Sequence, residues 1–473
     1  MNSDVSTPLA KLPATVDVLI LGAGGAGYPA AFFLDRAGLS VAMIDPIGNL
    51  GGDCLAEGCV PSKAVREAAL VCGLADKYAH FGLRGAKVGA DWRAVLKHKD
   101  RVQQTRYDQH REEIAASTVR FVKGRGTIIA PDRARLEAAD GVREIGFRHL
   151  ILATGSRPAR LPIAGAELAI TSHDLFRLGA DLPQPRHLVI IGGGYIGVET
   201  AAMLQALGSA VTILEYAPQL LPGFDAELAA FLHAGLARRV RIMVSAQVTG
   251  IVKKDDGYAV HYRCDGRECA VTGDAVLMAS GRVPVLPDGA EHLNLRLEHG
   301  HVVVDETLRS SNPRVWAPGD VNGRSMLFHS AVRQSLVAAH CIAAGGQAVD
   351  RMHFAAVPMT VFAEPELAHV GLTATQAEAA YGAAAVAVAR YDYAGDARAQ
   401  IYGETGGFIK LVFDRRTARL LGGQIAGIDA AQLIAPLALA VEQGLGAAAL
   451  AATAFPHPMI SEGIARAARA FRP

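Results

Sequence analysis

Cysteine is scarce in this chain of 473 residues, which contains only six. That number is too small for the dense disulfide framework that stabilises small secreted domains. It favours a cytoplasmic setting, where thiols stay reduced and a disulfide persists only if it takes part in catalysis.

An excess of either charge is also lacking. The chain carries 47 Lys and Arg against 46 Asp and Glu, a formal net charge of +1. This balance gives no electrostatic footprint for nucleic acid or another polyanion. We predict no nucleic-acid partner, and no metal site.

Long apolar runs are missing as well. The longest candidate, residues 430–441, is too short to cross a bilayer and contains Gln432 and Pro436. The first 15 residues show neither the apolar core of a secretory signal nor the Arg-rich pattern of a transit peptide. We expect no membrane association and no cleaved leader.

What the chain does have is the composition of a large globular enzyme, with 51% hydrophobic and 20% charged residues. Its length exceeds what one hydrophobic core supports, so two to four domains are expected.

The most informative stretch is residues 51–63, where Cys54 and Cys59 are followed directly by Pro-Ser-Lys. On a regular helix, Cα atoms at the spacing of this pair would lie roughly 8.6 Å apart. A disulfide needs Cα atoms within about 7 Å. Because Gly58 can adopt unusual dihedrals and Pro61 cannot complete a helical ladder, a distorted segment could bridge the pair. Such a bridge would be strained and easily reduced, as a catalytic disulfide must be.

A dinucleotide-binding unit precedes this stretch. It consists of a buried strand at 16–21, a glycine-rich turn with Gly22, Gly24 and Gly27, a helix at 30–36, a second strand at 39–44 and the acid Asp45. The glycines permit a tight turn and the close approach of a pyrophosphate, whose charge meets free amides at the helix N-terminus. Asp45 would accept a hydrogen bond from a ribose hydroxyl.

The same unit then occurs a second time. Here the first strand is 187–191, the glycines are Gly192, Gly194 and Gly197, the helix is 198–207, the second strand is 210–214 and the acid is Glu215. The last glycine and the acid have the same spacing in both copies, Gly27 to Asp45 and Gly197 to Glu215. The sequence therefore predicts an α/β fold with two Rossmann-like domains that bind two dinucleotides.

Beyond residue 354 the pattern changes. Apolar strands at 407–413 and 420–426 alternate with alanine-rich helices at 373–381 and 430–443, and glycine fingerprints are absent. This indicates a C-terminal α+β domain of a different kind.

The Gly-Gly-x-Cys-x4-Cys-x-Pro-Ser-Lys spacing in 51–63 resembles the redox signature of the flavin-dependent pyridine nucleotide–disulfide oxidoreductases. Both fingerprints, the Ala-Thr-Gly segment 153–155, the segment 307–320 and the segment 455–462 are similar to other motifs of that family. The resemblance implies an FAD domain, an NAD domain and a C-terminal dimerisation domain. The implied bounds are 1–157 with 283–350, then 158–282, then 351–473.

The resemblance also implies roles for site residues. The first cysteine, Cys54, would exchange with the substrate and the second, Cys59, would face the flavin. Lys63 and Glu199 would pair beside the reactive nitrogen of the flavin, where a cation stabilises negative charge on the reduced flavin and on a Cys59 thiolate. Two solvated helix charges are the alternative. Further cofactor contacts implied are those of Gly52, Thr154, Gly155, Gly281 and, at the ribityl chain, Asp320.

His457 and Glu462 match the family's catalytic base and its carboxylate partner. Pro458 favours an extended backbone at His457, and Glu462 could hold the imidazole in one tautomer. The resemblance implies a homodimer in which His457 takes a proton from the partner's Cys54 or from a substrate thiol.

The acid of the second unit predicts NAD rather than NADP. Glu215 can bind two ribose hydroxyls but would repel a 2′-phosphate, and no arginine follows it before Arg238. Tyr195 resembles the ring that covers the nicotinamide pocket in several members, with a plain packing role as the alternative.

A second cysteine pair repeats the same spacing without the flanking motif. Cys264 and Cys269 surround an Asp-Gly sequence, which is typical of a hairpin turn.

Within the family, the NAD-type acid and Pro-Ser-Lys together match the dihydrolipoyl dehydrogenases, whose substrate is a small-molecule or lipoyl-domain dithiol. Asp53 and Ala56 depart from the usual Thr and Asn of that group, and Glu57 adds a second acid. Phe-Pro before His457 is nearer the glutathione reductase pattern, whereas no cysteine follows Cys341 to match the C-terminal pair of mercuric reductases. A disulfide or metal-ion reductase is the alternative, and a non-enzymatic flavin redox sensor a remote one.

Overall fold

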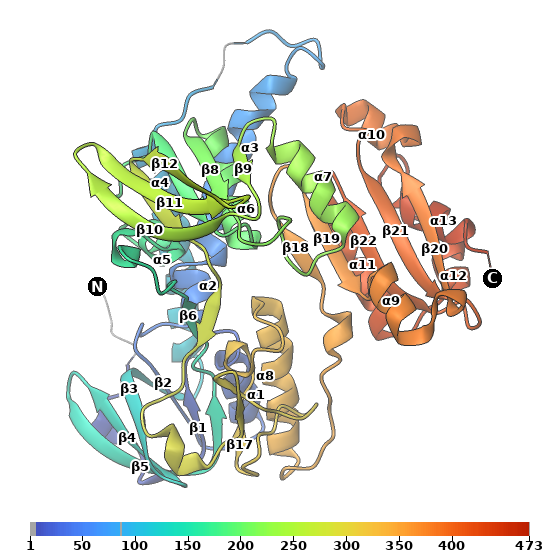
Figure 1. Ribbon diagram of the computed structural model, residues 1–473. Helices are drawn as coiled ribbons and strands as arrows, with labels where there is room; N and C mark the ends of the chain where they lie inside the picture. Colours follow the sequence, from blue (N-terminus) through green and yellow to red (C-terminus); the bar gives the residue numbers. More distant parts are fainter. Residues whose placement is uncertain (1–5, 86–87, 473) are drawn as a thin grey trace.

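The computed structural model describes residues 6–85 and 88–472. Two lobes built on parallel sheets stand one above the other in Figure 1, and an antiparallel sheet with helices lies beside them. The predicted α/β fold with two Rossmann-like units and a C-terminal α+β unit is confirmed. The interpretation of the first 15 residues falls partly on residues 1–5, outside the described part.

The first parallel sheet has the strand order β3-β2-β1-β5-β17, and β4 joins β3 to β5 antiparallel. Its strands are β1 (Thr15–Leu21), β2 (Val41–Asp45), β3 (Arg120–Ala130), β4 (Arg133–Ala138), β5 (Gly141–Leu152) and β17 (Val315–Trp316). Every residue of β2 is buried, as expected for a parallel strand covered on both faces. Helices α1 (Tyr28–Arg36) and α8 (Phe328–Ala343) pack together against this sheet.

The second parallel sheet, β9-β8-β7-β13, repeats the strands β3-β2-β1-β5 of the first. Its strands are β7 (His187–Ile191), β8 (Ala210–Leu214), β9 (Arg241–Met243) and β13 (Ala275–Met278), with α6 (Tyr195–Ala206) after β7. The antiparallel sheet β10 (Gln247–Lys254), β11 (Gly257–Cys264) and β12 (Arg267–Gly273) packs against it. The two copies share one strand order, as a duplicated dinucleotide fold requires.

The glycine turns of the two copies are built alike. Gly22 and Gly192 have φ values of +105° and +108°. A Cβ on them would lie 2.2 Å from the carbonyl oxygen of Ala153 and 2.4 Å from that of Ala279, respectively. Only glycine fits both the dihedral and the close approach of the neighbouring strand.

Both fingerprint helices begin earlier than predicted, α1 at Tyr28 and α6 at Tyr195. The early start places Pro29 in the first turn of α1, where the absent N–H leaves no hydrogen bond unmade.

The C-terminal sheet is antiparallel, in the order β18-β19-β22-β21-β20. Its strands are β18 (Met359–Val361), β19 (Leu367–Gly371), β20 (Val386–Asp392), β21 (Phe408–Asp414) and β22 (Leu420–Ala426). Helices α11 (Ala430–Glu442) and α13 (Glu462–Arg469) pack on it. The sequence predicted β21, β22 and α11 to within one residue.

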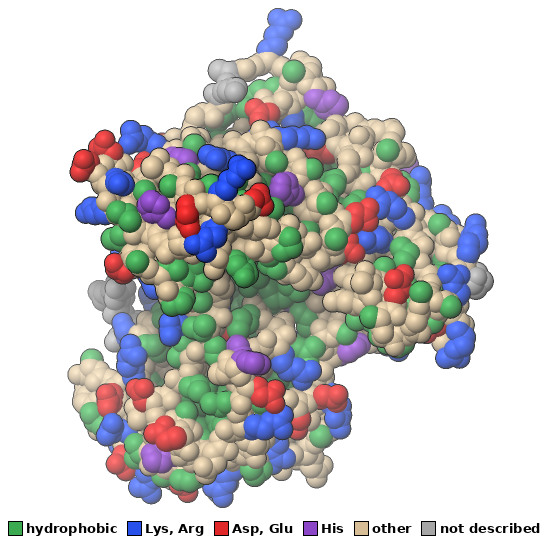
Figure 2. All heavy atoms as spheres, viewed as in Figure 1, with side chains coloured by type: hydrophobic (Ala, Val, Ile, Leu, Met, Phe, Trp, Pro, Cys, Tyr) green, Lys and Arg blue, Asp and Glu red, His purple; other side chains and the backbone are tan. Residues whose placement is uncertain are grey.

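The remaining elements connect these units. They are α2 (Gly52–Ala56), α3 (Cys59–Leu74), α4 (Trp92–Ala115), β6 (Ser156–Pro158), α5 (Ser172–Phe176), α7 (Ala226–Leu236), β14 (Arg282–Pro284), β15 (Leu297–Glu298), β16 (His301–Val302), α9 (Ala374–Tyr381), α10 (Ala397–Tyr402) and α12 (Ala447–Ala452). Figure 2 shows a hollow between the upper and lower lobes with hydrophobic side chains on its visible walls. Across residues 6–85 and 88–472, no helix has both the length and the apolar composition that crossing a bilayer demands.

Candidate active site

The two cysteines of the redox segment lie on either side of a break in a helix. Helix α2 ends at Ala56, and α3 begins at Cys59. Gly58, at φ −128° and ψ −110°, leaves the helical region, and a Cβ there would lie 2.9 Å from the carbonyl oxygen of Asp53. The predicted distortion is therefore present. Pro61 is not its cause, because it lies in the first turn of α3, where proline is tolerated.

Both cysteines are free thiols, and they are joined by a hydrogen bond. Accepting the hydrogen bond from Cys54 lowers the pKa of Cys59, burial opposes this effect, and the charge of Lys63 adds to it. The same hydrogen bond, together with burial, raises the pKa of Cys54. Cys59 is thus the thiol that ionises first, and Cys54 stays protonated beside it.

The structure brings Lys63 and Glu199 together. Lys63 Nζ on α3 lies 2.6 Å from Glu199 Oε2 on α6, and it also lies 4.5 Å from the centre of the Phe362 ring. Glu199 is buried, and its other oxygen accepts a hydrogen bond of 2.9 Å from the Phe362 amide. The pair is held from three directions and is not two solvated helix charges.

The acids of the two dinucleotide units have the same local role. Asp45 accepts a hydrogen bond of 2.8 Å from the Ala23 amide, within the glycine turn. Glu215 accepts one of 2.5 Å from the Gly193 amide, at the equivalent place. Burial raises the pKa of Asp45, and its backbone hydrogen bonds oppose that shift. Each acid therefore fixes the turn that the sequence predicts to hold a pyrophosphate.

Glycines leave a cradle at each of the two turns that side chains would fill, with Gly52 and Gly155 at the first and Gly194 and Gly281 at the second. A Cβ on Gly52 would lie only 2.7 Å from the Cα of Gly24, so the redox segment rests directly on the first fingerprint. No atom lies within 4 Å of the Cβ positions of Gly155, Gly194 and Gly281. Backbone that is close-packed on one side and open on the other suits the approach of a dinucleotide.

Asp320 is tied to the first residues of β6 and β14. Ser156 Oγ donates a hydrogen bond of 2.5 Å to Asp320 Oδ2, and the Arg282 Nε lies 3.9 Å from the same oxygen. Burial raises the pKa of Asp320, against the effect of that hydrogen bond and of the arginine. The neighbouring Thr154 hydroxyl donates to the Val285 carbonyl at 2.5 Å. Tyr195 is half-buried at the start of α6, and burial raises its pKa.

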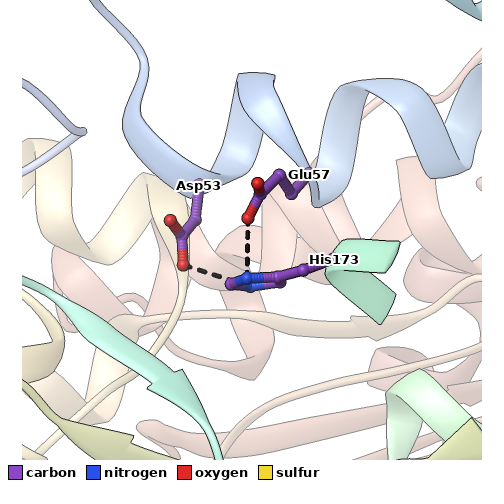
Figure 3. A group of neighbouring side chains, drawn as sticks. All are labelled: Asp53, Glu57 and His173. Atoms are coloured by element: carbon purple, nitrogen blue, oxygen red, sulfur yellow. Dashed lines mark ion pairs between the residues drawn. The ribbon is translucent and has the colours of Figure 1, made fainter. Parts of the chain in front are cut away.

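Two residues without a predicted role lie against the redox segment. His173, on α5, contacts Glu57 at 2.6 Å and Asp53 at 3.4 Å, as Figure 3 shows. Arg282 Nη2 lies 2.5 Å from Asp53 Oδ2. No local pattern predicts either contact, because His173 and Arg282 are more than 100 positions from the segment that they touch.

We expect the charge of His173 to make the stability of the protein depend on pH. Burial alone would lower its pKa, but hydrogen bonds to Asp53 and Glu57 outweigh burial and raise it to about 9. Because this value lies above the ordinary 6.5, the stabilisation is complete below about pH 6.5 and is lost as the pH rises through about 9. Urea unfolding of the protein and of His173→Gln at pH 6.5 and at pH 9.5 should give a smaller difference at the higher pH. An equal difference at both values would contradict a charged imidazole.

The predicted base and its partner are together, but they lie away from the cysteines. His457 Nδ1 is 2.8 Å from Glu462 Oε2, and this hydrogen bond lowers the pKa of Glu462. The His457 side chain is 69% exposed. Figure 1 shows α13, which begins at Glu462, at the right-hand edge of the chain, whereas α2 lies between the two lobes. A single chain does not bring His457 to Cys54.

The second cysteine pair lies in a hairpin, as predicted. Cys264 ends β11, and Cys269 lies in β12, with Asp265 and Gly266 in the turn at φ +50° and +73°. Positive φ at both central residues is the geometry of a tight hairpin turn. Of the two other cysteines, Cys341 is buried in α8 and Cys72 half-buried in α3.

Family models match most of the chain. Residues 16–335 match the model described as "Pyridine nucleotide-disulphide oxidoreductase", and residues 357–468 match the dimerisation domain of that family. The chain belongs to the pyridine nucleotide-disulphide oxidoreductase family. Members of this family are flavoproteins that bind FAD and a nicotinamide nucleotide, and the two glycine cradles described above fit this pair of cofactors.

Individual relatives cover nearly the whole chain. The dihydrolipoyl dehydrogenase of Geobacillus stearothermophilus is 33% identical over 94% of this chain and 94% of its own. That of Bacillus subtilis is 32% identical over 95% of each. Among solved structures, the HOCl-induced flavoprotein disulfide reductase RclA from Escherichia coli, in a Cu(II) complex, has a TM-score of 0.83 at 27% identity. It covers 96% of this chain and 99% of that one.

Proposed function

We propose that this protein moves two electrons between a dithiol, of the dihydrolipoyl type, and NAD through a disulfide of Cys54 and Cys59. The observation that carries the proposal is the pair of thiols across the broken helix, hydrogen-bonded to each other beside Lys63 and Glu199. A pair with one easily ionised thiol and one protonated thiol is suited to thiol–disulfide exchange.

In the direction of dithiol oxidation, one substrate thiolate attacks Cys54 Sγ of the disulfide, and Cys59 leaves as a thiolate. His457 takes the proton of the attacking thiol. The second substrate thiol then attacks the substrate sulfur of the mixed disulfide and its proton passes to Cys54, so that the substrate leaves as a disulfide and Cys54 becomes a thiol. The hydrogen bond from Cys54 and the charge of Lys63 favour the Cys59 thiolate. Bound FAD would carry the two electrons onward from the cysteine pair to the nicotinamide.

The first fingerprint would hold FAD and the second NAD. Gly22, Gly24, Gly27 and Asp45, with Asp320 at the ribityl chain, would form the FAD site. Gly192, Gly194, Gly197 and Glu215 would form the nicotinamide-nucleotide site, with Tyr195 at its mouth. Support comes from the matching strand orders and turns of the two units.

The complete active site would need two copies of the chain. His457 lies exposed on the dimerisation domain, held by Glu462, whereas the cysteines lie between the two dinucleotide units. An imidazole must come within about 3 Å of the thiol that it deprotonates. A two-fold dimer would bring His457 of each copy to Cys54 of the other.

The scarcity of cysteine supports a cytoplasmic location for this enzyme.

A reductase of disulfides or metal ions is the second candidate. It is favoured by the similarity to RclA, whose solved structure is a Cu(II) complex, and by the acids Asp53 and Glu57 beside the cysteines. Purified enzyme with NADH should be assayed against lipoamide, oxidised glutathione, Hg(II) and Cu(II). Our proposal expects lipoamide to give the highest kcat/KM, and a higher value for a metal ion or for glutathione would favour the second candidate.

We expect a preference for NADH over NADPH of at least about tenfold in kcat/KM, because a 2′-phosphate would lie beside the Glu215 carboxylate. Steady-state kinetics with both nucleotides measures it. Glu215→Gln can still accept the hydrogen bond of Gly193, so it should narrow the preference while the fold is kept. A native enzyme that prefers NADPH would refute the assignment.

A further inference from the structure

Two acids flank the reactive cysteines, and the proposed chemistry does not use either. Asp53 directly precedes Cys54, and Glu57 lies between the cysteines. Negative charge here would disfavour a thiolate, so the acids require compensation. His173 supplies a bridge between them: its Nδ1 lies 2.6 Å from Glu57 and its Nε2 3.4 Å from Asp53, as Figure 3 shows.

This arrangement favours a bridging imidazolium over a bound metal ion, although three potential ligands lie close together. The two carboxylates face opposite nitrogens of the ring, so each nitrogen can donate a hydrogen bond to one of them. The guanidinium of Arg282 occupies the Asp53 oxygen nearest the ring, and its Nη1 lies 3.4 Å from the ring Nε2. A metal ion at that nitrogen would have to displace the guanidinium from the same carboxylate oxygen.

The charges around the cluster balance. Asp53 and Glu57 are offset by His173 and Arg282. Burial would raise the pKa of Asp53, but the hydrogen bond from His173 and the charge of Arg282 outweigh it and lower the value. The other titratable groups that interact with members of the cluster are Asp45 and Asp320, which face Asp53, Tyr107, which faces Glu57, and Tyr195, which faces Arg282.

The segment between the cysteines is tied to α5 a second time, through α4. Gln103 donates hydrogen bonds of 3.0 and 2.7 Å to the carbonyls of Leu55 and Ala56. Buried Lys99 donates to Gln103 at 2.9 Å and to the carbonyl of Phe176, the last residue of α5, at 3.3 Å. His173 therefore stands on an element whose distance from the cysteines is fixed independently of the ion pairs.

We propose that His173 is a positioning residue that neutralises the two acids beside the cysteine pair and so favours the Cys59 thiolate. The proposal rests on the proposed role of the pair as the redox centre. It predicts shifts of opposite sign for opposite charge changes. His173→Gln leaves Glu57 without a cationic partner and should raise the pKa of Cys59 by about one unit. Glu57→Gln leaves an excess of positive charge and should lower it by a similar amount.

The test is the pH profile of iodoacetamide alkylation in the NADH- or dithiothreitol-reduced holoenzyme, with the site read by mass spectrometry. The pH titration of the long-wavelength absorbance of a thiolate beside flavin gives a second readout. Glu57→Gln/His173→Gln should restore a profile close to that of the native protein, although both contacts are lost. His98→Gln, an exposed residue of α4, is the matched control and should leave the profile unchanged.

If the thiol pKa shifts in the same direction in His173→Gln and Glu57→Gln, or shifts in neither, the proposal is overturned. A mere packing defect would not shift the pKa in opposite directions for opposite changes of charge. Zn(II) binding to the oxidised holoenzyme that His173→Gln abolishes would overturn it too, and would identify a metal site. Alkylation reports thiol ionisation without turnover. It therefore fails or succeeds separately from the proposed dithiol activity.

Discussion

Replacing either redox cysteine by serine is expected to reduce dithiol turnover by on the order of 10⁴ or more while FAD stays bound. Each sulfur takes part in the covalent exchange, and a serine hydroxyl cannot form the disulfide. The contacts predicted for FAD lie in the glycine turns and at Asp320, which neither substitution touches. Activity and the flavin-to-protein ratio, measured on the same preparation, test this expectation.

The two serine variants should differ in their spectra. In Cys54→Ser the hydroxyl can donate the hydrogen bond that the Cys54 thiol donates now, and Lys63 remains near, so Cys59 should still ionise. This variant should keep the long-wavelength absorbance of a thiolate beside oxidised flavin. Cys59→Ser should lose it. If the absorbance survives the loss of Cys59 and disappears with Cys54, the two roles are reversed.

His457→Gln should reduce kcat by about 10²–10⁴ and leave the flavin spectrum unchanged. A general base accelerates a reaction by a factor in this range. The flavin spectrum should not change, because the His457 side chain is exposed on the single chain and lies away from both predicted cofactor sites. Glu462→Gln keeps a hydrogen-bond acceptor for the imidazole but removes the charge, so a smaller loss is expected.

Mixed dimers test whether this histidine acts on the other copy of the chain. Subunits with Cys54→Ser and subunits with His457→Gln are each nearly inactive alone. A heterodimer contains one site with both native residues if His457 reaches across the interface, so mixing should restore up to about half of the native activity per heterodimer. Heterodimers that form without regaining activity would show that the site lies within one chain.

Much of the fold could be predicted because it is encoded locally. The two glycine fingerprints, their following acids and the buried strands before them lie within short stretches, and the structure repeats them strand by strand. The break between Cys54 and Cys59 was also predictable, since the spacing of a disulfide does not fit a regular helix.

The contacts of the redox segment with α5 and β14 could not be predicted in this way. Asp53 and Arg282 are 229 positions apart, and only the packing of the two dinucleotide units makes them neighbours. The sequence marks Glu57 as unusual, but it does not identify the partner of Glu57. His173 is one of 16 histidines in the chain, and no motif on α5 distinguishes it. In the proposed dimer, the position of His457 relative to Cys54 depends on a second copy of the chain, which no local sequence pattern encodes.

The central claim is that NADH reduces a disulfide of Cys54 and Cys59 through bound FAD. It is tested most directly by anaerobic addition of one equivalent of NADH to the oxidised holoenzyme, followed by iodoacetamide and mass spectrometry. We predict that neither cysteine is alkylated before NADH is added, that both are alkylated afterwards, and that long-wavelength absorbance appears with the flavin still largely oxidised. If the flavin bleaches while Cys54 and Cys59 stay unchanged, the cysteine pair is not the redox centre.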